Sequence, residues 1–562
     1  MPALAQVPSA LGNAVPQGSP LPYVLPSAPP PLGGALPSLP GPAQPTPVPA
    51  ANVAVQSAVI EGATAFPDAQ LQPLIAGTTG PAVSLASIEA ARLAILNLYR
   101  QTGYALITVN AALDRSGRLR FVVIEGYIAK IRLEGDIGAA ATQALRFLTN
   151  LVGQRPIDTA TLERYLLLVQ DIPGVAIHAV LRPAPDDPGA LTLIAQLSRQ
   201  AFDGQLSVDN RGFRQTGPVE VLALFDANSF SQFGERTEVS LYHADGDTET
   251  FGQASEEFFV GGSGLKIRIY GGDGETTPSD TLRAIGYHGF TTDIGAAATY
   301  PVIRSRRQTL TVGLYFDVEN SEIKLDAGPQ GQSIRSGLDQ LRVGRVGADY
   351  VSQDLWAGLD RTAVNAIEFR LSQGFPGLGG TTTSNPTPSR TGEQPGFTKI
   401  SGEIARTQGL FVPWQGATVA LKAAVAGQYS GDVLPPVEQY FLGGAEFDRG
   451  FYAGQVTGDT ALTWTLELQL NTAFDVTAFG HPLNLGTQFY GFYDRGETWN
   501  NTPLDPDQRL SSEGMGVRLS VTRNTEFDLE GVIRNTRVPS GTEGEVSALK
   551  ADALYWRALA RF

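Results

Sequence analysis

A regular alternation of apolar and polar residues runs from about residue 200 to the C-terminus. The runs are about ten residues long and are separated by Gly, Asp, Asn, Ser, Thr and Pro. The longest run has an apolar residue at every second position: Leu462, Trp464, Leu466, Leu468 and Leu470. Successive side chains of a strand point to opposite faces, so the pattern predicts β-strands with one apolar and one polar face. A tilted strand needs about 9 to 11 residues to cross a membrane, which these runs provide.

Alternation alone leaves two architectures open, a soluble β-sandwich and a membrane barrel. Length favours the barrel, because about 16 strands of about ten residues would leave more than half of residues 200–562 for short turns on one rim and long loops on the other. Residues 373–396, rich in Gly, Thr, Ser and Pro, fit such a long loop. A spanning helix needs about 18 nearly uninterrupted apolar residues, and no such stretch occurs. We therefore expect a membrane all-β barrel of about 16 antiparallel strands over residues 200–562.

Two small α+β units precede this region, one over residues 52–127 and one over residues 128–199. Each shows the order strand, helix, helix, strand, strand in its hydrophobic pattern. In the first unit, Ser84 is placed to cap a helix that ends near Gly103, and a β-hairpin follows. In the second unit, Asp158 is placed at the start of the second helix.

The N-terminal 51 residues differ from the rest in composition. Residues 1–50 contain 15 prolines and no charged residue. Such a segment favours extended chain and cannot bury enough apolar surface to fold. We interpret residues 1–51 as a disordered Pro-rich tether, with a segment threaded through a pore as the alternative, and assign no site to it.

Composition and missing motifs exclude several classes of function. The chain has no cysteine, which excludes disulfides, thiolate metal sites and a cysteine nucleophile. Its formal net charge of -15 argues against nucleic-acid binding, because phosphate neutralisation needs clustered Lys and Arg. Residues 261–266 lack the Walker spacing, so no nucleotide site is expected. The 4 histidines stand in no metalloprotease motif and no serine in a Gly-x-Ser-x-Gly motif, so we expect neither an enzyme nor a cofactor.

Two acidic clusters raise the question of calcium binding. They are Asp-Gly-Asp at residues 245–247 and Asp-Pro-Asp at residues 505–507. Carboxylates at close spacing can bind calcium. Solvated loop tips explain both clusters more simply, so we expect no metal site.

The C-terminal region contains three motifs. Residues 441–451 read FLGGAEFDRGF, residues 492–496 read FYDRG, and residues 208–217 read VDNRGFRQTG. Together they resemble the motifs of two-partner secretion (type Vb) outer-membrane transporters of the TpsB type, similar to ShlB, FhaC and HecB. The resemblance covers about residues 52–562, in which the two small units look like paired POTRA domains. The C-terminal Phe562, on one strand face with Trp556, resembles the assembly signal of bacterial outer-membrane barrels.

The resemblance implies a set of site residues inside the barrel. In the family, the arginine of the sixth extracellular loop meets a strand aspartate in the lumen, which maps onto Arg449 and Asp494. Period two places Phe492, Asp494 and Gly496 on one strand face, and that face must then be the lumen. Three glycines would let the loop pack closely against the wall and a phenylalanine would anchor it: Gly443, Gly444, Gly450 and Phe451.

One residue departs from the family pattern. Asp448 stands where the family usually has an aliphatic residue, so the packing or charge balance around Arg449 would differ. The first 50 residues also show no amphipathic helix of the kind that plugs the barrel in some members.

The resemblance also implies a function. The protein would lie in a bacterial outer membrane, with its POTRA domains in the periplasm, and export one large TpsA-like exoprotein in extended form to the cell surface. The POTRA domains would bind this client by adding its chain to an exposed strand edge. Outer-membrane lipid and the barrel-assembly machinery would be its other partners. The alternative is a barrel-assembly or lipid-modifying relative of the same superfamily, although such assembly factors usually carry more than two POTRA units.

Overall fold

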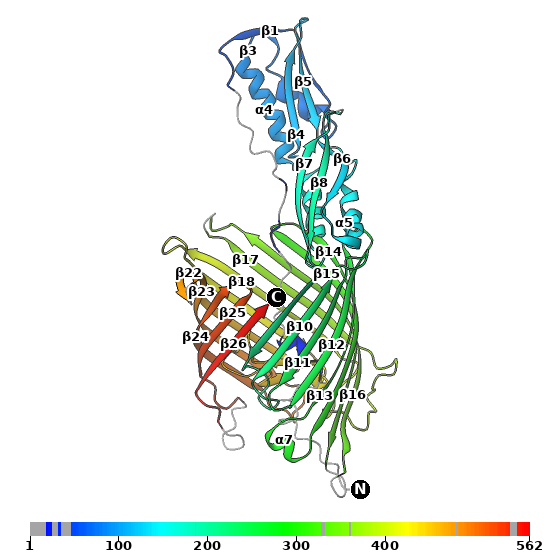
Figure 1. The fold of residues 1–562 in the computed structure, drawn as a ribbon, viewed down its shortest axis with the longest axis vertical. Helices are drawn as coiled ribbons and strands as arrows, with labels where there is room; N and C mark the ends of the chain where they lie inside the picture. Colours follow the sequence, from blue (N-terminus) through cyan, green and yellow to red (C-terminus); the bar gives the residue numbers. More distant parts are fainter. Residues whose placement is uncertain are drawn as a thin grey trace.

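The computed structural model describes residues 18–24, 32–34, 37, 47–185, 187–326, 332–358, 361–478, 481–539 and 548–562. It shows two small α+β domains stacked on one rim of a closed β-barrel (Figure 1). We call this rim the near rim and the opposite one the far rim. Among the described residues, no helix has the length and hydropathy needed to cross a membrane.

The first small domain contains two short sheets and two helices. Its elements are β1 (Asn52–Val55), β2 (Ser57–Glu61), α3 (Asp68–Ile75), β3 (Gly80–Ser84), α4 (Leu85–Gln101), β4 (Ile107–Leu113) and β5 (Arg118–Glu125). The strands form a sheet in the order β2-β5-β4 and a separate β1-β3 pair. The Ser84 side chain caps α4 by accepting a hydrogen bond from the Ser87 N–H. The domain therefore has one short sheet more than the expected pattern of five elements.

A buried carboxylate ties the first domain together. Glu125, at the end of β5, is 0% exposed. It accepts hydrogen bonds from the Thr64 N–H at 2.7 Å, from the Ala65 N–H at 3.1 Å and from the Tyr99 hydroxyl at 2.7 Å. Burial alone would raise the pKa of Glu125, but these bonds to the charged form outweigh it and hold the pKa below its usual value.

The second small domain follows directly. Its elements are β6 (Tyr127–Glu134), η1 (Gly138–Ala140), α5 (Ala141–Leu148), η2 (Thr149–Leu151), α6 (Thr159–Gln170), β7 (Val175–Pro183) and β8 (Ala190–Arg199). The strand order is β6-β8-β7, and the two helices pack on one apolar cluster with the sheet. Asp158 caps α6 by accepting a hydrogen bond from the Thr161 N–H.

This second domain is fixed to the near rim by polar and aromatic contacts. Arg304 at the end of β14 donates two hydrogen bonds of 2.7 Å to the Asp171 carboxylate. Phe147 of α5 packs edge-on against Phe259 of β12, with ring centroids 5.1 Å apart. The domain thus extends away from the near rim, above β14 and β15 in Figure 1.

The barrel is a single antiparallel sheet of 16 strands. The strands are β9 (Phe202–Asp209), β10 (Glu220–Asn228), β11 (Arg236–Ala244), β12 (Glu249–Val260), β13 (Leu265–Thr276), β14 (His288–Arg304), β15 (Gln308–Leu325), β16 (Ile334–Asp354), β17 (Ala363–Gly374), β18 (Thr398–Phe411), β19 (Thr418–Ser430), β22 (Thr460–Ala478), β23 (His481–Trp499), β24 (Gln508–Thr522), β25 (Thr525–Arg534) and β26 (Asp552–Arg561). Pairing of β26 with β9, in which Arg557 lies opposite Asp209, closes it. The fold class predicted from alternation and length is confirmed.

The two faces of the barrel strands follow the period of two. Leu314 is 61% exposed and Leu468 is 53% exposed on the outer face. On the inner face, Thr463 is buried and Glu467 is 1% exposed. The apolar set of residues therefore faces outwards, towards the hydrocarbon layer, while the polar set lines the lumen.

A short N-terminal segment lies in the lumen. Residues 18–24 include the one-turn helix α2 (Leu21–Val24), whose blue ribbon is inside the barrel in Figure 1. Leu21 is buried in a cluster with Leu222, Tyr242 and Phe251 of the inner wall. These residues differ from the expected disordered tether, because an apolar patch on the wall buries a side chain that the segment could not bury by itself. The rest of the expected tether lies largely outside the described residues.

Candidate functional site

One connection of the far rim folds back into the barrel. It comprises residues 431–459, between β19 and β22, and we call it the lumen loop. It contains η4 (Pro436–Glu438) and two short strands, β20 (Tyr440–Leu442) and β21 (Val456–Gly458). These strands pair with each other as an antiparallel hairpin, in which Tyr440 lies opposite Gly458. The hairpin carries residues 443–455 at its tip.

Arg449 attaches this tip to the inner wall. Its Nε and Nη2 donate to the two carboxylate oxygens of Asp494 on β23, each at 2.9 Å. Nη1 pairs with Glu467 on β22, and Nη2 also donates to the Thr465 hydroxyl at 2.9 Å. Arg449 is 3% exposed and Asp494 is 0% exposed. The structure thus brings the arginine of the loop and the aspartate of the strand into a planar bidentate pair.

A further ion pair lies next to Arg449. Glu467 accepts a second ion pair from Arg518 of β24 at 2.9 Å, so two guanidinium groups face two carboxylates. The Arg449 guanidinium also lies 3.6 Å from the ring centroid of Phe492, where the ring face attracts a cation. Sequence reasoning did not assign Glu467 or Arg518. The signal for Glu467 in the sequence was its place on the polar face of the run that begins at Leu462. Thr465 lies on the same face and directly opposite Asp494 in the β22-β23 register.

Four glycines make room for the loop. Gly443 and Gly444 have φ values of 104° and 124°, which other residues rarely adopt. A Cβ on Gly450 would lie 2.5 Å from the Cβ of Ser512 on the wall. A Cβ on Gly496 would lie 2.3 Å from Oδ2 of Asp448. The glycine of the strand motif therefore leaves the space that the Asp448 carboxylate occupies.

Asp448 is buried beside the arginine. It is 0% exposed, and its Oδ2 accepts a hydrogen bond of 2.9 Å from the Thr463 hydroxyl. Its Oδ1 has no hydrogen-bond partner among the described residues. The residue that departs from the family pattern is thus accommodated by Thr463 and by the missing side chain at Gly496.

The first far-rim connection also contacts the loop tip. Arg211, within the VDNRGFRQTG stretch, donates to the carbonyl oxygens of Gly444 at 3.0 Å and Arg449 at 2.5 Å, and pairs with Glu530 at 2.6 Å. From the wall, Arg534 donates to the Gly450 carbonyl at 2.5 Å. The sequence motif flagged the stretch around Arg211 but gave no role to this side chain.

The remaining predicted residues lie in two places. Phe451 is 0% exposed and packs with Leu442, Val456 and Leu510 between the loop and the wall. Trp556 lies on β26 and Phe562 directly follows this strand, and Phe562 is 65% exposed. Within the described part of the chain, no group of three or more His, Asp or Glu residues is arranged to hold a metal ion.

Comparisons with known proteins agree with this architecture. A family model described as haemolysin secretion/activation protein ShlB/FhaC/HecB matches residues 192–519, and one described as POTRA domain, ShlB-type, matches residues 53–126. The chain is 20% identical over 463 residues to the heme/hemopexin transporter protein HuxB of Haemophilus influenzae, covering 80% of this chain and 78% of that protein. It is 23% identical over 387 residues to the hemolysin transporter protein HpmB of Proteus mirabilis, covering 64% of this chain and 62% of that protein.

A solved structure shows the same fold. CdiB from Escherichia coli aligns with a TM-score of 0.71 at 17% identity, covering 93% of both chains. The alignment therefore includes the small domains as well as the barrel.

Proposed function

This chain belongs to the haemolysin secretion/activation (ShlB/FhaC/HecB) family of outer-membrane transporters, and from that premise we propose that it exports one specific, large exoprotein through its barrel. The family secretes partner exoproteins and is not a family of enzymes. The protein is an outer-membrane β-barrel with periplasmic POTRA domains, so the near rim is periplasmic and the far rim is extracellular. The client, its docking and its path are the proposed parts.

The single observation that carries the proposal is how the lumen loop is held. A loop that permanently sealed the barrel could be packed by apolar contacts alone. Here Phe451 gives the tip one apolar contact with the wall, and hydrogen bonds and ion pairs centred on Arg449 hold it otherwise, between groups on the polar inner face. Water can replace such bonds as the loop leaves, whereas exposed apolar surface has no replacement. This chemistry supports a loop that moves aside for a passing chain.

The periplasmic side offers a route to the lumen. Among the described strands, β2 and β4 are the edges of one sheet and β6 and β7 are the edges of the other, and an extended client can add to such an edge by main-chain hydrogen bonds. A cavity of about 1190 Å³ at the near rim is lined by residues 170–176 of the second POTRA-like domain and by barrel residues such as Arg236, Glu257 and Arg370. Its mixed charge suits a polar, unfolded chain rather than an apolar ligand.

The membrane face and the C-terminus suit the other proposed partners. Outward-facing side chains such as Leu314 and Leu468 form the surface for outer-membrane lipid. The exposed Phe562 is accessible to the barrel-assembly machinery. With no nucleotide motif in the sequence, folding of the client outside the cell, which prevents its return, is the proposed energy source.

Deletion of the gene tests this function. We expect one large, β-rich exoprotein to accumulate in the periplasm while other outer-membrane barrels stay at normal levels. Complementation with the wild-type gene should restore export of that exoprotein. A general loss of outer-membrane barrels would instead support an assembly factor and refute the proposal.

A further inference from the structure

A second buried arginine lies at the extracellular rim, apart from the Arg449 cluster. Arg390 belongs to the connection between β17 and β18 and is 3% exposed. Its Nε donates to Asp505 at 2.7 Å, and its Nη1 and Nη2 donate to Asp459 at 2.5 and 3.1 Å. Nη1 also donates to the Leu434 carbonyl at 2.8 Å, and Nη2 to the Asn500 side chain at 3.0 Å. All five guanidinium N–H groups therefore have acceptors.

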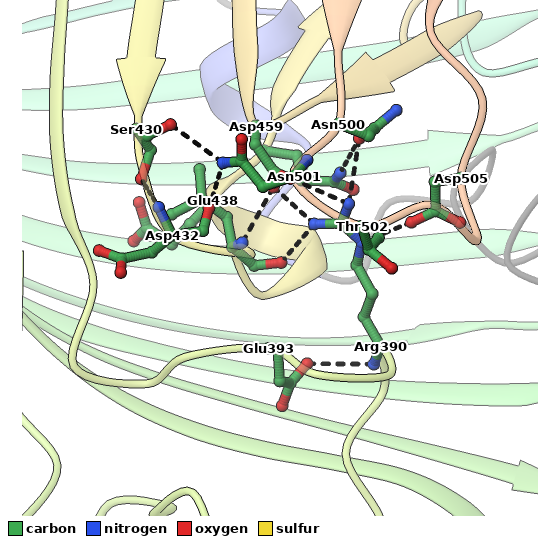
Figure 2. Close-up of polar contacts among 12 residues, drawn as sticks. Arg390, Glu393, Ser430, Asp432, Glu438, Asp459, Asn500, Asn501, Thr502 and Asp505 are labelled. Carbon is green, nitrogen blue, oxygen red and sulfur yellow. Dashed lines mark hydrogen bonds and ion pairs between the residues drawn. The ribbon is translucent and has the colours of Figure 1, made fainter.

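Asp459 is the main partner of this arginine. It is 0% exposed and accepts two further hydrogen bonds, from the Leu434 N–H at 2.9 Å and the Asn501 N–H at 2.8 Å. Figure 2 shows the Arg390 side chain reaching from its loop into the group formed by Asp459, Asn500 and Asp505. We call Arg390, Asp459, Asp505 and Asn500 the rim clamp.

The rim clamp joins three extracellular connections. Arg390 comes from the β17–β18 connection, and Asn500 and Asp505 come from the β23–β24 connection. Asp459 and Leu434 lie at the two ends of the lumen loop, next to β22 and just after β19. The arginine thus holds both limbs of the lumen loop at its base, whereas Arg449 holds its tip.

The clamp corrects one expectation from the sequence. Residues 505–507 were interpreted as a solvated loop tip, which is wrong for Asp505, because it is 6% exposed and ion-paired with Arg390. These ion pairs also explain why an arginine of the Gly- and Thr-rich β17–β18 connection can be buried. The backbone N–H of Arg390 is held in turn by the Glu393 carboxylate at 3.0 Å, the contact at the bottom of Figure 2.

We propose that Arg390 is a positioning residue of the transporter, which fixes the base of the lumen loop through Asp459 and keeps the extracellular exit closed until this contact opens. The proposal rests on the proposed function, in which the loop moves aside for the client. All four clamp residues are in connections between barrel strands, so opening the clamp breaks no strand pairing. The first limb has an additional tie through Glu438, which pairs with Arg345 at 2.5 Å and Lys399 at 2.6 Å. Arg390 is therefore expected to govern chiefly the second limb, at Asp459.

A buried probe position lies under that second limb. Thr498 of β23 is 0% exposed, and its hydroxyl has no hydrogen-bond partner among the described residues. Gly458 lies directly above it, since a Cβ on Gly458 would be 2.6 Å from the Thr498 Cβ. The chain has no cysteine, so the substitution Thr498→Cys introduces a single thiol that is covered while the loop base is closed.

The experiment measures how fast a membrane-impermeant maleimide labels this thiol in the full-length protein in outer membranes, without client. We expect Arg390→Ala to raise the labelling rate at least about tenfold, which corresponds to about 1.4 kcal/mol. Arg342→Ala is the matched control. Arg342 donates to the Leu378 and Gly379 carbonyls of the same β17–β18 connection but does not contact the lumen loop through any described hydrogen bond. Its loss should leave the rate unchanged.

A second variant protects the test against misfolding. Asp459→Asn keeps the side-chain size and removes the charge that Arg390 binds, and we expect it to raise the rate as well. Heat-modifiable migration in gels shows which variants have a folded barrel. The proposal is overturned if folded Arg390→Ala and Asp459→Asn proteins both label at the wild-type rate, or if Arg342→Ala raises the rate equally. Because labelling needs no client, this result is independent of whether the exoprotein is exported.

Discussion

Removing Arg449 should destabilise the protein by an amount that depends on which carboxylate loses its partner. Glu467 keeps its ion pair with Arg518 at 2.9 Å. Among the described residues, Asp494 keeps a bond from the Thr465 hydroxyl at 2.5 Å and one from the backbone N–H at position 449. Breaking a buried ion pair costs about 3 to 5 kcal/mol, and with one carboxylate still paired we expect about 3 kcal/mol for Arg449→Ala.

A double-mutant cycle separates this pair from its surroundings. Asp494→Asn should cost a similar amount, because it leaves the arginine without its bidentate partner. The double variant leaves no unpaired charge on Asp494, so we expect a coupling free energy of about 2 kcal/mol. The assay is urea unfolding of the barrel in lipid vesicles, followed by tryptophan fluorescence.

An exposed pair on the same strand gives the control. Arg495 and Glu497 are 2.5 Å apart, with side chains 48% and 34% exposed, and exposed pairs contribute about 0 to 1 kcal/mol. Arg495→Ala should therefore change the free energy of unfolding much less than Arg449→Ala does. If the free-energy changes of Arg449→Ala and Asp494→Asn add to within about 0.5 kcal/mol, Arg449 and Asp494 do not stabilise the protein as a pair.

Three other contacts can be tested by substitution. Gly496→Ala places a Cβ 2.3 Å from Asp448 and should reduce export while the barrel still folds, whereas Gly531→Ala, with no atom within 4 Å of its new Cβ, should export normally in the same assay. Arg304→Ala removes the bidentate ion pair to the second POTRA-like domain and should speed hydrogen exchange in α6, measured by mass spectrometry. The pKa of the Glu125 carboxylate is lowered in the folded protein, so this group stabilises the first domain at pH values above the usual pKa of about 4.3. The stabilisation is lost as the pH falls through the lowered pKa. Glu125→Gln should therefore make the free energy of unfolding of the first domain depend less on pH in this range.

Periodicity predicted the strands and their two faces, because a strand with one apolar face places an apolar residue at every second position, and the length of the region then favoured a barrel over a sandwich. The outward Leu314 and the inward Thr463 both follow this rule. The Arg449 and Asp494 positions came from the resemblance, since nothing in their spacing indicates that they meet. Glu467 could have been added from its inward position on the strand beside Asp494.

The rim clamp could not be predicted in the same way. Arg390 and Asp459 come from irregular connections, where no period fixes the direction of a side chain, and they lie far apart in sequence. Likewise, Leu21 is buried only because the inner wall presents an apolar patch at its position. These contacts form only when the fold brings the segments together. The segments themselves show no periodic sequence pattern from which the contacts could be predicted.

The most direct test of passage through the lumen uses two neighbouring residues of β23. Tyr490 faces the lumen and is 6% exposed, whereas Phe489 faces the membrane and is 44% exposed. A photo-crosslinking phenylalanine analogue is placed at each position in turn, and the client is stalled during export. We predict crosslinks to the client from position 490 and none from position 489. Crosslinks from position 489 alone, or from neither position while export proceeds, would contradict a path through the barrel.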